Sequence, residues 1–184
     1  MERVWYFAYG SNMQRATFCG RRGIEFHRAV AARLPGWRLV FDKPPLLPVN
    51  EGYANVVPDA ASEVLGVAYE LSAPALDVID LTEGVLIGNY ERRMVSIMAL
   101  GDAVAPAGAF TLTSERRDPA LLPSTRYMAL LIDGAIEHNL PATYVEFLRA
   151  VPARAQSEAG VALQELIDSA LDAMKPRAGG SLKP

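Results

Sequence analysis

The strongest constraint on this chain is the tetrapeptide Tyr-Gly-Ser-Asn at residues 9–12, which directly follows a short apolar segment. That segment, residues 4–8, is rich in aromatic side chains and predicts a buried strand, and residues 13–18 predict a short helix. The glycine allows a tight turn, and Ser11 and Asn12 are good caps for the helix. Free backbone N–H groups at such a turn favour an anion or a developing oxyanion. Local chemistry alone favours the simpler interpretation, a capped turn without a ligand.

Length and charge exclude several classes of protein. The 184 residues, 51% of them hydrophobic, suit a single domain, which we place at residues 1–175. Residues 176–184 carry Gly, Ser and Pro and predict a disordered tail. The net charge of −3 and the lack of a basic block argue against nucleic acid as a partner. No apolar stretch is long enough to span a bilayer, so no membrane partner is expected.

The thiol and imidazole side chains argue for a reducing compartment and against a metal centre. Cys19 is the single cysteine, and the N-terminus lacks the pattern of a secretory signal, so we expect a cytoplasmic protein. His27 and His138 lie far apart in the sequence and, with Cys19, supply too few ligands for zinc. We therefore expect no metal.

Strand patterns fill the first two thirds of the chain, and helix patterns fill the last third. Pro35 and Gly36 mark a turn, and a proline-rich loop follows at residues 43–52. Ser72 caps a helix that carries Pro74 in its first turn. Further strands are predicted at residues 37–41, 54–57, 63–71, 90–100 and 105–112, and further helices at residues 124–139, 141–151 and 158–175. This order predicts an α+β protein in which helices pack outside a mixed sheet or small barrel.

Three carboxylates in the first predicted long helix are candidates for acid/base chemistry. Asp77, Asp80 and Glu83 are spaced three apart, which places them broadly on one side of a helix. Such a side is most often a solvated face. Glu83 differs from the other two because the helix gives way to Gly84 directly after it. From local sequence alone, a surface acid before a terminal glycine remains the simpler interpretation.

Landmarks along the chain, taken together, resemble the γ-glutamylcyclotransferase family. They begin with Tyr9 and the rest of the tetrapeptide, continue with the segment Ile79–Gly84, and include Tyr90, seven residues after Glu83. The order and spacing of these motifs are specific, although each motif alone is weak. Further landmarks are Gly52-Tyr53-Ala54 and residues 64–69, 122–127 and 139–144, so the resemblance covers roughly residues 4 to 150.

The resemblance implies a fold and a reaction. The fold is a small mixed β-barrel flanked by helices, with the site at the barrel mouth between the tetrapeptide and Glu83. The family converts a γ-glutamyl amide to 5-oxoproline and a free amine, because the α-amine of the substrate attacks its own γ-carbonyl. The chain therefore needs no nucleophilic Ser or Cys, and this chemistry needs no metal and no organic cofactor. It must instead fold the substrate, move protons and stabilise an oxyanion.

The resemblance also assigns roles to individual residues. Glu83 becomes the candidate general acid/base. Tyr9 and Tyr90 can hydrogen-bond the substrate or orient Glu83, and each can equally be a core aromatic with a satisfied hydroxyl. Tyr127 is a further candidate for substrate binding, with helix packing as its alternative. The backbone N–H groups expected to hold the α-carboxylate or the oxyanion are those of Gly10, Ser11 and Asn12.

The substrate stays open at this stage. The glutathione-specific branch of the superfamily usually carries Leu where this chain has Asn12, so the chain is more similar to the γ-glutamyl-amino-acid branch. One alternative is the same chemistry on a γ-glutamyl-amine or a γ-glutamyl-protected biosynthetic intermediate, with the loop at residues 43–51 enlarging the leaving-group pocket. Another is a non-catalytic binding module on the same fold. A homodimer is compatible with each of these functions.

Overall fold

A six-stranded mixed sheet forms the centre of the molecule. The computed structural model describes residues 2–101 and 106–174, so the predicted disordered tail at residues 176–184 lies outside the described residues. The strands are arranged in the order β4-β6-β1-β3-β2-β5. Their bounds are β1 Arg3–Ala8, β2 Arg28–Lys43, β3 Tyr53–Ser72, β4 Glu91–Ser96, β5 Met98–Ala99 and β6 Gly108–Thr113.

The pairing of the strands explains how the sheet curls. β1 runs antiparallel to β3, with Arg3 opposite Ser72 and Ala8 opposite Val67, and parallel to β6 on its other side. Three strands, β6, β1 and β3, lie between β4 and β2 in the sheet order. β2 and β4 nevertheless contact each other, which requires the sheet to curve. The sheet is thus a half-barrel with β4 and β5 as its edges, and the predicted class, α+β with a small barrel and flanking helices, is confirmed.

The second and third strands are longer than predicted. The predicted turn at Pro35 and Gly36 is wrong: the strand continues through it as a bulge, and Gly36 adopts the left-handed region with φ 78°. The predicted break at residues 58–62 is also wrong, because β3 runs through it without interruption. Side chains at residues 58–62 are exposed or half-buried, and only Pro58 among them pairs with β2, so this stretch resembles a loop although the strand continues.

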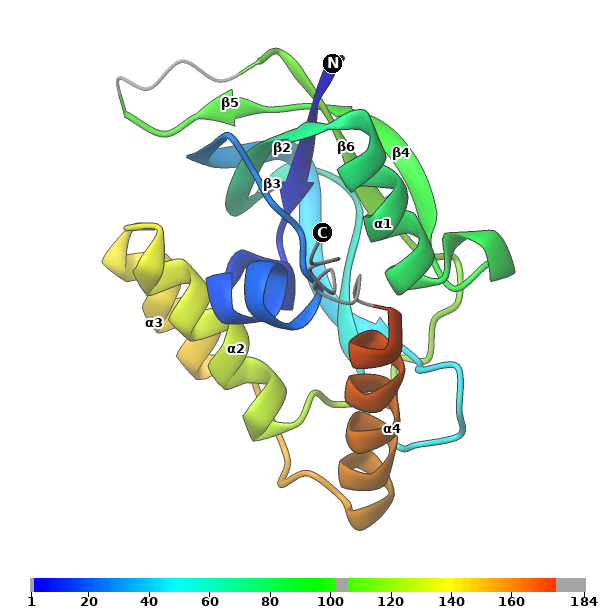
Figure 1. Cartoon of the computed structure of the whole chain (residues 1–184). Coiled ribbons are helices and arrows are strands. Elements are labelled where there is room, and N and C mark those ends of the chain that lie inside the picture. The colour runs from blue at the N-terminus through cyan, green and yellow to red at the C-terminus, as the bar shows by residue number, and fades with distance from the viewer. Residues whose placement is uncertain (1, 102–105, 175–184) are drawn as a thin grey trace, which may run out of the picture.

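Helices cover the curled sheet on several sides (Figure 1). In that view α2 and α3 lie side by side at the left, α1 lies at the right and α4 lies below. Ser72 caps α1 as predicted, since its Oγ accepts a hydrogen bond from Ala75 N at 3.4 Å. No helix in residues 2–101 and 106–174 has the length and hydrophobicity needed to cross a membrane. The helix bounds are α1 Ala73–Glu83, α2 Thr125–Glu137, α3 Ala142–Ala150 and α4 Glu158–Met174, with short helices η1 Ser11–Met13, η2 Ala16–Arg21 and η3 Val85–Ile87.

The segment after β1 departs from the predicted single helix at residues 13–18. It is divided into the 3₁₀ turn η1 and the π-helix η2, because Gln14 between them is extended. Neither Ser11 nor Asn12 caps a helix: Gly10 occupies the cap position of η1, and no side chain bonds there. The side chain of Asn12 is instead buried and donates a hydrogen bond to Glu83 at the end of α1, so it does not cap a helix.

Helix α2 packs directly on the backbone of this segment. A Cβ at Gly134 would lie 2.6 Å from the amide nitrogen of Gln14 and 2.7 Å from the carbonyl carbon of Met13. Real Cβ atoms are essentially never found this close to backbone, so only glycine allows α2 to approach this closely. The helix thereby supports η1, the segment that carries Asn12.

We expect Gly134→Ala to lower the free energy of unfolding by about 1–3 kcal/mol, because the methyl group forces α2 away from η1. Urea denaturation measures this change. Gly20→Ala is the matched control, since a Cβ at that glycine of η2 meets nothing within 4 Å. Equal stability of the two variants would show that α2 does not pack on η1 as described.

Candidate active site

A cavity of about 490 Å³ opens where the turn after β1, the end of α1 and α4 meet. The loop between β2 and β3 closes another part of its wall through Pro45, Leu46 and Leu47. Cavities of this volume suit small molecules. All of the site residues predicted from sequence line it, namely Tyr9, Gly10, Ser11, Asn12, Glu83, Tyr90 and Tyr127.

Glu83 is held at one oxygen and open at the other. It is the last residue of α1, and Gly84 ends the helix in the left-handed region with φ 71°. Its Oε1 accepts a hydrogen bond from Asn12 Nδ2 at 2.8 Å and pairs with a terminal nitrogen of Arg22 at 2.8 Å. The described residues form no hydrogen bond with Oε2. The carboxylate is therefore fixed in direction while one oxygen stays free for a ligand.

The predicted solvated face of α1 is correct only for Asp77, which is exposed. Asp80 is buried and forms an ion pair with Arg92 at 2.8 Å, and burial raises the pKa of its carboxyl. The side chain of Glu83 is 16% exposed. Although these carboxylates are three residues apart, their neighbours therefore separate them into a surface acid, a buried ion pair and a cavity-lining acid.

The turn itself presents an extended glycine. Gly10 has φ −112° and ψ −149°, so it does not occupy the left-handed region that favours glycine. A Cβ there would instead lie 3.2 Å from the Tyr127 hydroxyl and 3.4 Å from Ala54 Cβ, which is a tight fit. Glycine is thus required here by the closeness of Tyr127, and a larger side chain would push into the cavity.

Three tyrosines stand around the turn with their hydroxyls bonded to backbone. Tyr9 donates to Leu112 O at 2.5 Å, and Tyr90 donates to Ala54 O at 3.0 Å. The Tyr127 hydroxyl accepts from Ala54 N at 3.2 Å, and Ser124 positions Tyr127 by capping α2. Burial raises the pKa of all three phenols, so they are neutral hydrogen-bonding groups at ordinary pH. Tyr9 and Tyr90 therefore combine the two predicted alternatives, a satisfied hydroxyl and a place on the cavity wall.

Polar groups near Glu83 are buried without partners. Asn12 Oδ1 and two nitrogens of Arg22, Nε and one NH, have no hydrogen-bond partner among the described residues. The side chain of Arg22 is only 9% exposed. Buried polar atoms are normally hydrogen-bonded, so unpartnered ones beside a cavity are typical of a ligand or water site.

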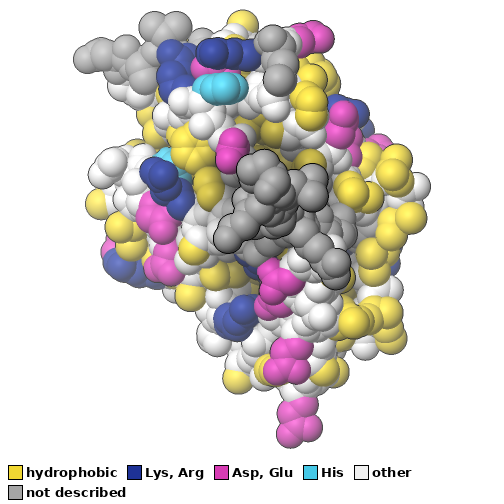
Figure 2. All heavy atoms as spheres, in the orientation of Figure 1, with side chains coloured by type: hydrophobic (Ala, Val, Ile, Leu, Met, Phe, Trp, Pro, Cys, Tyr) yellow, Lys and Arg dark blue, Asp and Glu magenta, His cyan; other side chains and the backbone are white. Residues whose placement is uncertain are grey.

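The cavity mouth is apolar. Leu81, Leu86 and Ile87 at the end of α1 and in η3 are more than half exposed, and Leu81 and Ile87 also line the cavity. Figure 2 shows hydrophobic side chains gathered at the right of the molecule, where α1 and η3 lie in Figure 1. The site therefore has a polar interior at Glu83 and an aliphatic rim.

Comparisons with known proteins agree with this geometry. Residues 63–148, which include Glu83 and Tyr127, match a family model described as the AIG2-like family. A γ-glutamyl cyclotransferase, aclK, of Aspergillus oryzae is 30% identical over 79% of this chain, and a γ-glutamylcyclotransferase of Homo sapiens is 28% identical over 82% of it. The chain is thus similar to the AIG2-like family and to γ-glutamylcyclotransferases.

The shared fold extends beyond the matched segment. A solved structure titled gamma-glutamyl cyclotransferase superposes with a TM-score of 0.74 and covers 91% of this chain and 99% of its own, at 24% identity. The chain spans 60% of the length of the Aspergillus relative and 79% of that of the human one. An AIG2-like fold thus accounts for nearly all of the described structure.

Sequence patterns missed two basic residues of this AIG2-like site. Arg22 follows η2 and Lys43 ends β2, so neither belongs to a motif. Lys43 is 2% exposed, and its Nζ donates to Asn89 Oδ1 at 2.5 Å and lies 4.5 Å from the centre of the Tyr90 ring. Burial lowers the pKa of Lys43 to about 8. The available signal in the sequence was a lysine at the end of an apolar strand.

A metal site is not formed by the described residues, since no three His, Cys, Asp or Glu side chains there are placed to share an ion. Cys19 is half-buried, and burial raises the pKa of its thiol. His138 contacts the Tyr69 hydroxyl through Nε2 at 3.0 Å and does not line the cavity. The chemistry available in the cavity is therefore that of one carboxylate, basic side chains and neutral hydrogen-bond donors.

The lowered pKa of Lys43 predicts how stability changes with pH. Between about 8 and the ordinary value of 10.5 the unfolded chain binds the proton more tightly, so stability rises with pH in this window. Lys43→Met removes this group. We expect the stability of the wild type, measured relative to Lys43→Met by urea denaturation, to rise by about 3 kcal/mol across the window. A difference that stays constant with pH would contradict the burial of a charged Lys43.

Proposed function

We propose that this protein is a γ-glutamylcyclotransferase that converts a γ-glutamyl amino acid to 5-oxoproline and a free amino acid in the described cavity. The observation that carries the proposal is the carboxylate of Glu83, fixed through Oε1 by Asn12 and Arg22 while Oε2 is free beside the tetrapeptide turn. The names of the relatives support the same activity.

The proposed reaction needs only one residue that transfers protons. Glu83 Oε2 takes a proton from the α-ammonium of the substrate, and the resulting amine attacks the γ-carbonyl carbon. As the C–N bond to the leaving amine breaks, Glu83 returns this proton to the leaving nitrogen. The attacking nitrogen loses a second proton as it becomes the lactam nitrogen of 5-oxoproline, and Glu83 passes this proton to the departing amine as well, which leaves as an ammonium group. The products are 5-oxoproline and the free amino acid, so no water and no co-reactant is consumed.

The other groups hold the substrate in the folded conformation that cyclisation needs. Backbone N–H groups of Gly10, Ser11 and Asn12 are assigned to the α-carboxylate or to the oxyanion on the γ-carbonyl oxygen. Tyr90 and Tyr127 border the same space as neutral phenols. Bringing the amine and carbonyl of one molecule together contributes much of the rate, since positioning alone can be worth many powers of ten.

Replacing the proposed base tests the mechanism directly. We expect folded Glu83→Gln protein to lose about a hundredfold to ten-thousandfold in kcat, because the amide keeps the size of the side chain but cannot take the proton. Release of 5-oxoproline measures the rate. Asp77→Asn is the matched control, since Asp77 is an exposed carboxylate on the same helix. Wild-type turnover in purified Glu83→Gln would exclude the proposed role.

The turn is tested separately from the base. We expect Gly10→Val to fold but to lose substrate binding or turnover, because the side chain would press on Tyr127 and Ala54 and enter the cavity. The loss of one oxyanion donor is typically worth about 3 kcal/mol in the transition state. The measurement is kcat/KM, with circular dichroism as a check of folding.

Gly20→Val serves as the control for this variant, because that glycine has open space around it. Full activity in folded Gly10→Val would mean that the tetrapeptide is only a turn and that the substrate is placed wrongly.

A further inference from the structure

Two cations, the buried Lys43 and the half-buried Arg116, donate to one neutral acceptor, Asn89, at the cavity wall. Asn89 Oδ1 accepts from Lys43 Nζ at 2.5 Å and from a terminal nitrogen of Arg116 at 2.9 Å. The other terminal nitrogen of Arg116 donates to Pro45 O at 3.0 Å. Of the two cations, Lys43 lines the cavity and Arg116 lies behind it.

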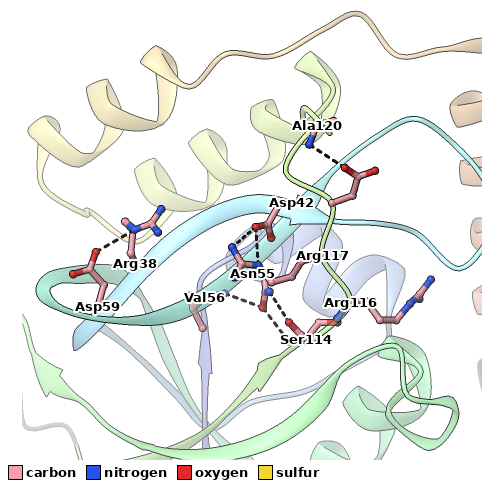
Figure 3. A network of polar contacts seen from close by, with 10 residues as sticks. Arg38, Asp42, Asn55, Val56, Asp59, Ser114, Arg116, Arg117 and Ala120 are labelled. Atoms are coloured by element: carbon pink, nitrogen blue, oxygen red, sulfur yellow. Dashed lines mark hydrogen bonds and ion pairs between the residues drawn. The ribbon is translucent and has the colours of Figure 1, made fainter.

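A network of polar contacts surrounds the end of β2 and the segment that carries Arg116 (Figure 3). Next to Lys43 in the chain, Asp42 pairs with Arg117 through bonds of 2.8 and 2.6 Å, and this fixes Arg116 beside the end of β2. Asn55, which is fully buried, exchanges hydrogen bonds with the Ser114 backbone at 2.8 and 3.0 Å. Hydrogen bonds therefore hold the side chains of Lys43 and Arg116 in fixed positions at the cavity wall.

The charge of Lys43 is not neutralised by the described residues. Neither Lys43 nor Arg116 has an Asp or Glu oxygen within ion-pair distance in the described part of the chain. Glu83 acts on Lys43 only from a distance, because its one bonded oxygen faces Asn12 and Arg22. Burial of an ammonium group costs free energy unless an anion pairs with it. The ammonium of Lys43 carries three N–H donors, and one of them bonds to Asn89. An anionic ligand group is the partner that this wall lacks.

We propose that Lys43 binds the carboxylate of the leaving amino acid, which makes it a specificity residue that selects γ-glutamyl amino acids over γ-glutamyl-amines. This inference rests on the proposed function, since it assigns the second half of the same substrate. Arg116 supports the site by sharing Asn89 with Lys43. Pro45, Leu46 and Leu47 line the cavity directly after Lys43 and would contact an apolar side chain of the leaving amino acid.

The contacts of Lys43 place it on the leaving-group side. Its ammonium lies over the ring of Tyr90, whose hydroxyl reaches Ala54 O. Ala54 N in turn donates to the Tyr127 hydroxyl, against which Gly10 packs. The contacts that link Lys43 to the turn assigned to the γ-glutamyl half thus run through Tyr90, Ala54 and Tyr127. A carboxylate on Lys43 is therefore the other carboxylate of the substrate.

A pair of substrates that differ only in this group tests the inference. γ-Glutamylalanine carries the carboxylate, and γ-glutamylalaninamide replaces it with a neutral amide. We expect the wild type to prefer the acid in kcat/KM by about tenfold or more, the usual effect of a charge-assisted hydrogen bond. We expect Lys43→Met to lower kcat/KM for the acid by about tenfold to a hundredfold and to change it less than about twofold for the amide.

A pH series gives a readout that a merely structural role would not move. With a pKa of about 8, Lys43 loses its charge as the pH rises through that value, so the preference for the acid should shrink there. Glu83 and Arg116 are the charged groups that act on Lys43. The α-amine is common to both substrates, so its titration cancels in the ratio.

Arg38→Met is the matched control variant, because Arg38 is a half-exposed cation on the same strand, paired with Asp59. It should leave the preference unchanged. An equal loss on both substrates in Lys43→Met would move the lysine to the γ-glutamyl half and overturn the inference. A wild type without preference would overturn it even if the variant failed to fold. In both cases 5-oxoproline is still formed, whereas failure of the proposed function would leave neither substrate cyclised.

Discussion

One oxygen atom joins the parts of this site. Glu83 Oε1 receives both Asn12 from the turn after β1 and Arg22 from the end of η2, so the end of α1 is bound to two segments far from it in sequence. Because Arg22 is nearly buried, removing either charge would leave the other one unpaired in a poorly solvated place. The same contact leaves Oε2 open to the cavity. A single ion pair thus supports the folding of the site and also fixes the direction of the Glu83 carboxylate.

The fold supplies what this ion pair cannot supply alone. Pairing of β1 with β3 brings the end of β1 close to the strand that leads into α1. Gly134 lets α2 approach the turn closely, and the Ser124 cap sets Tyr127 against Gly10. The curled sheet, the helices and the turn therefore meet around one cavity. A loop with the same tetrapeptide on a flat sheet would not have these walls.

The sequence predicted the parts of the site that lie in short local motifs. Glu83 was found because it ends a helix, and Asn12 was found because it belongs to the tetrapeptide that follows a strand. Arg22 escaped because Arg21 stands beside it: Arg21 pairs with Asp168 on α4, Arg22 pairs with Glu83, and local sequence cannot tell them apart. Lys43 escaped because a lysine before prolines resembles the start of a loop, and only the contacts with Asn89 and Tyr90 show its burial.

In the proposed reaction the α-amine of the substrate attacks the γ-carbonyl of the same molecule. The origin of the oxygen atoms in the products distinguishes this step from attack by water. Purified protein would be incubated with γ-glutamylalanine in oxygen-18-labelled water, and the products would be analysed by mass spectrometry. Intramolecular attack predicts unlabelled 5-oxoproline in equal amount to free alanine. Glutamate carrying one labelled oxygen would show that water is the nucleophile and would contradict the account.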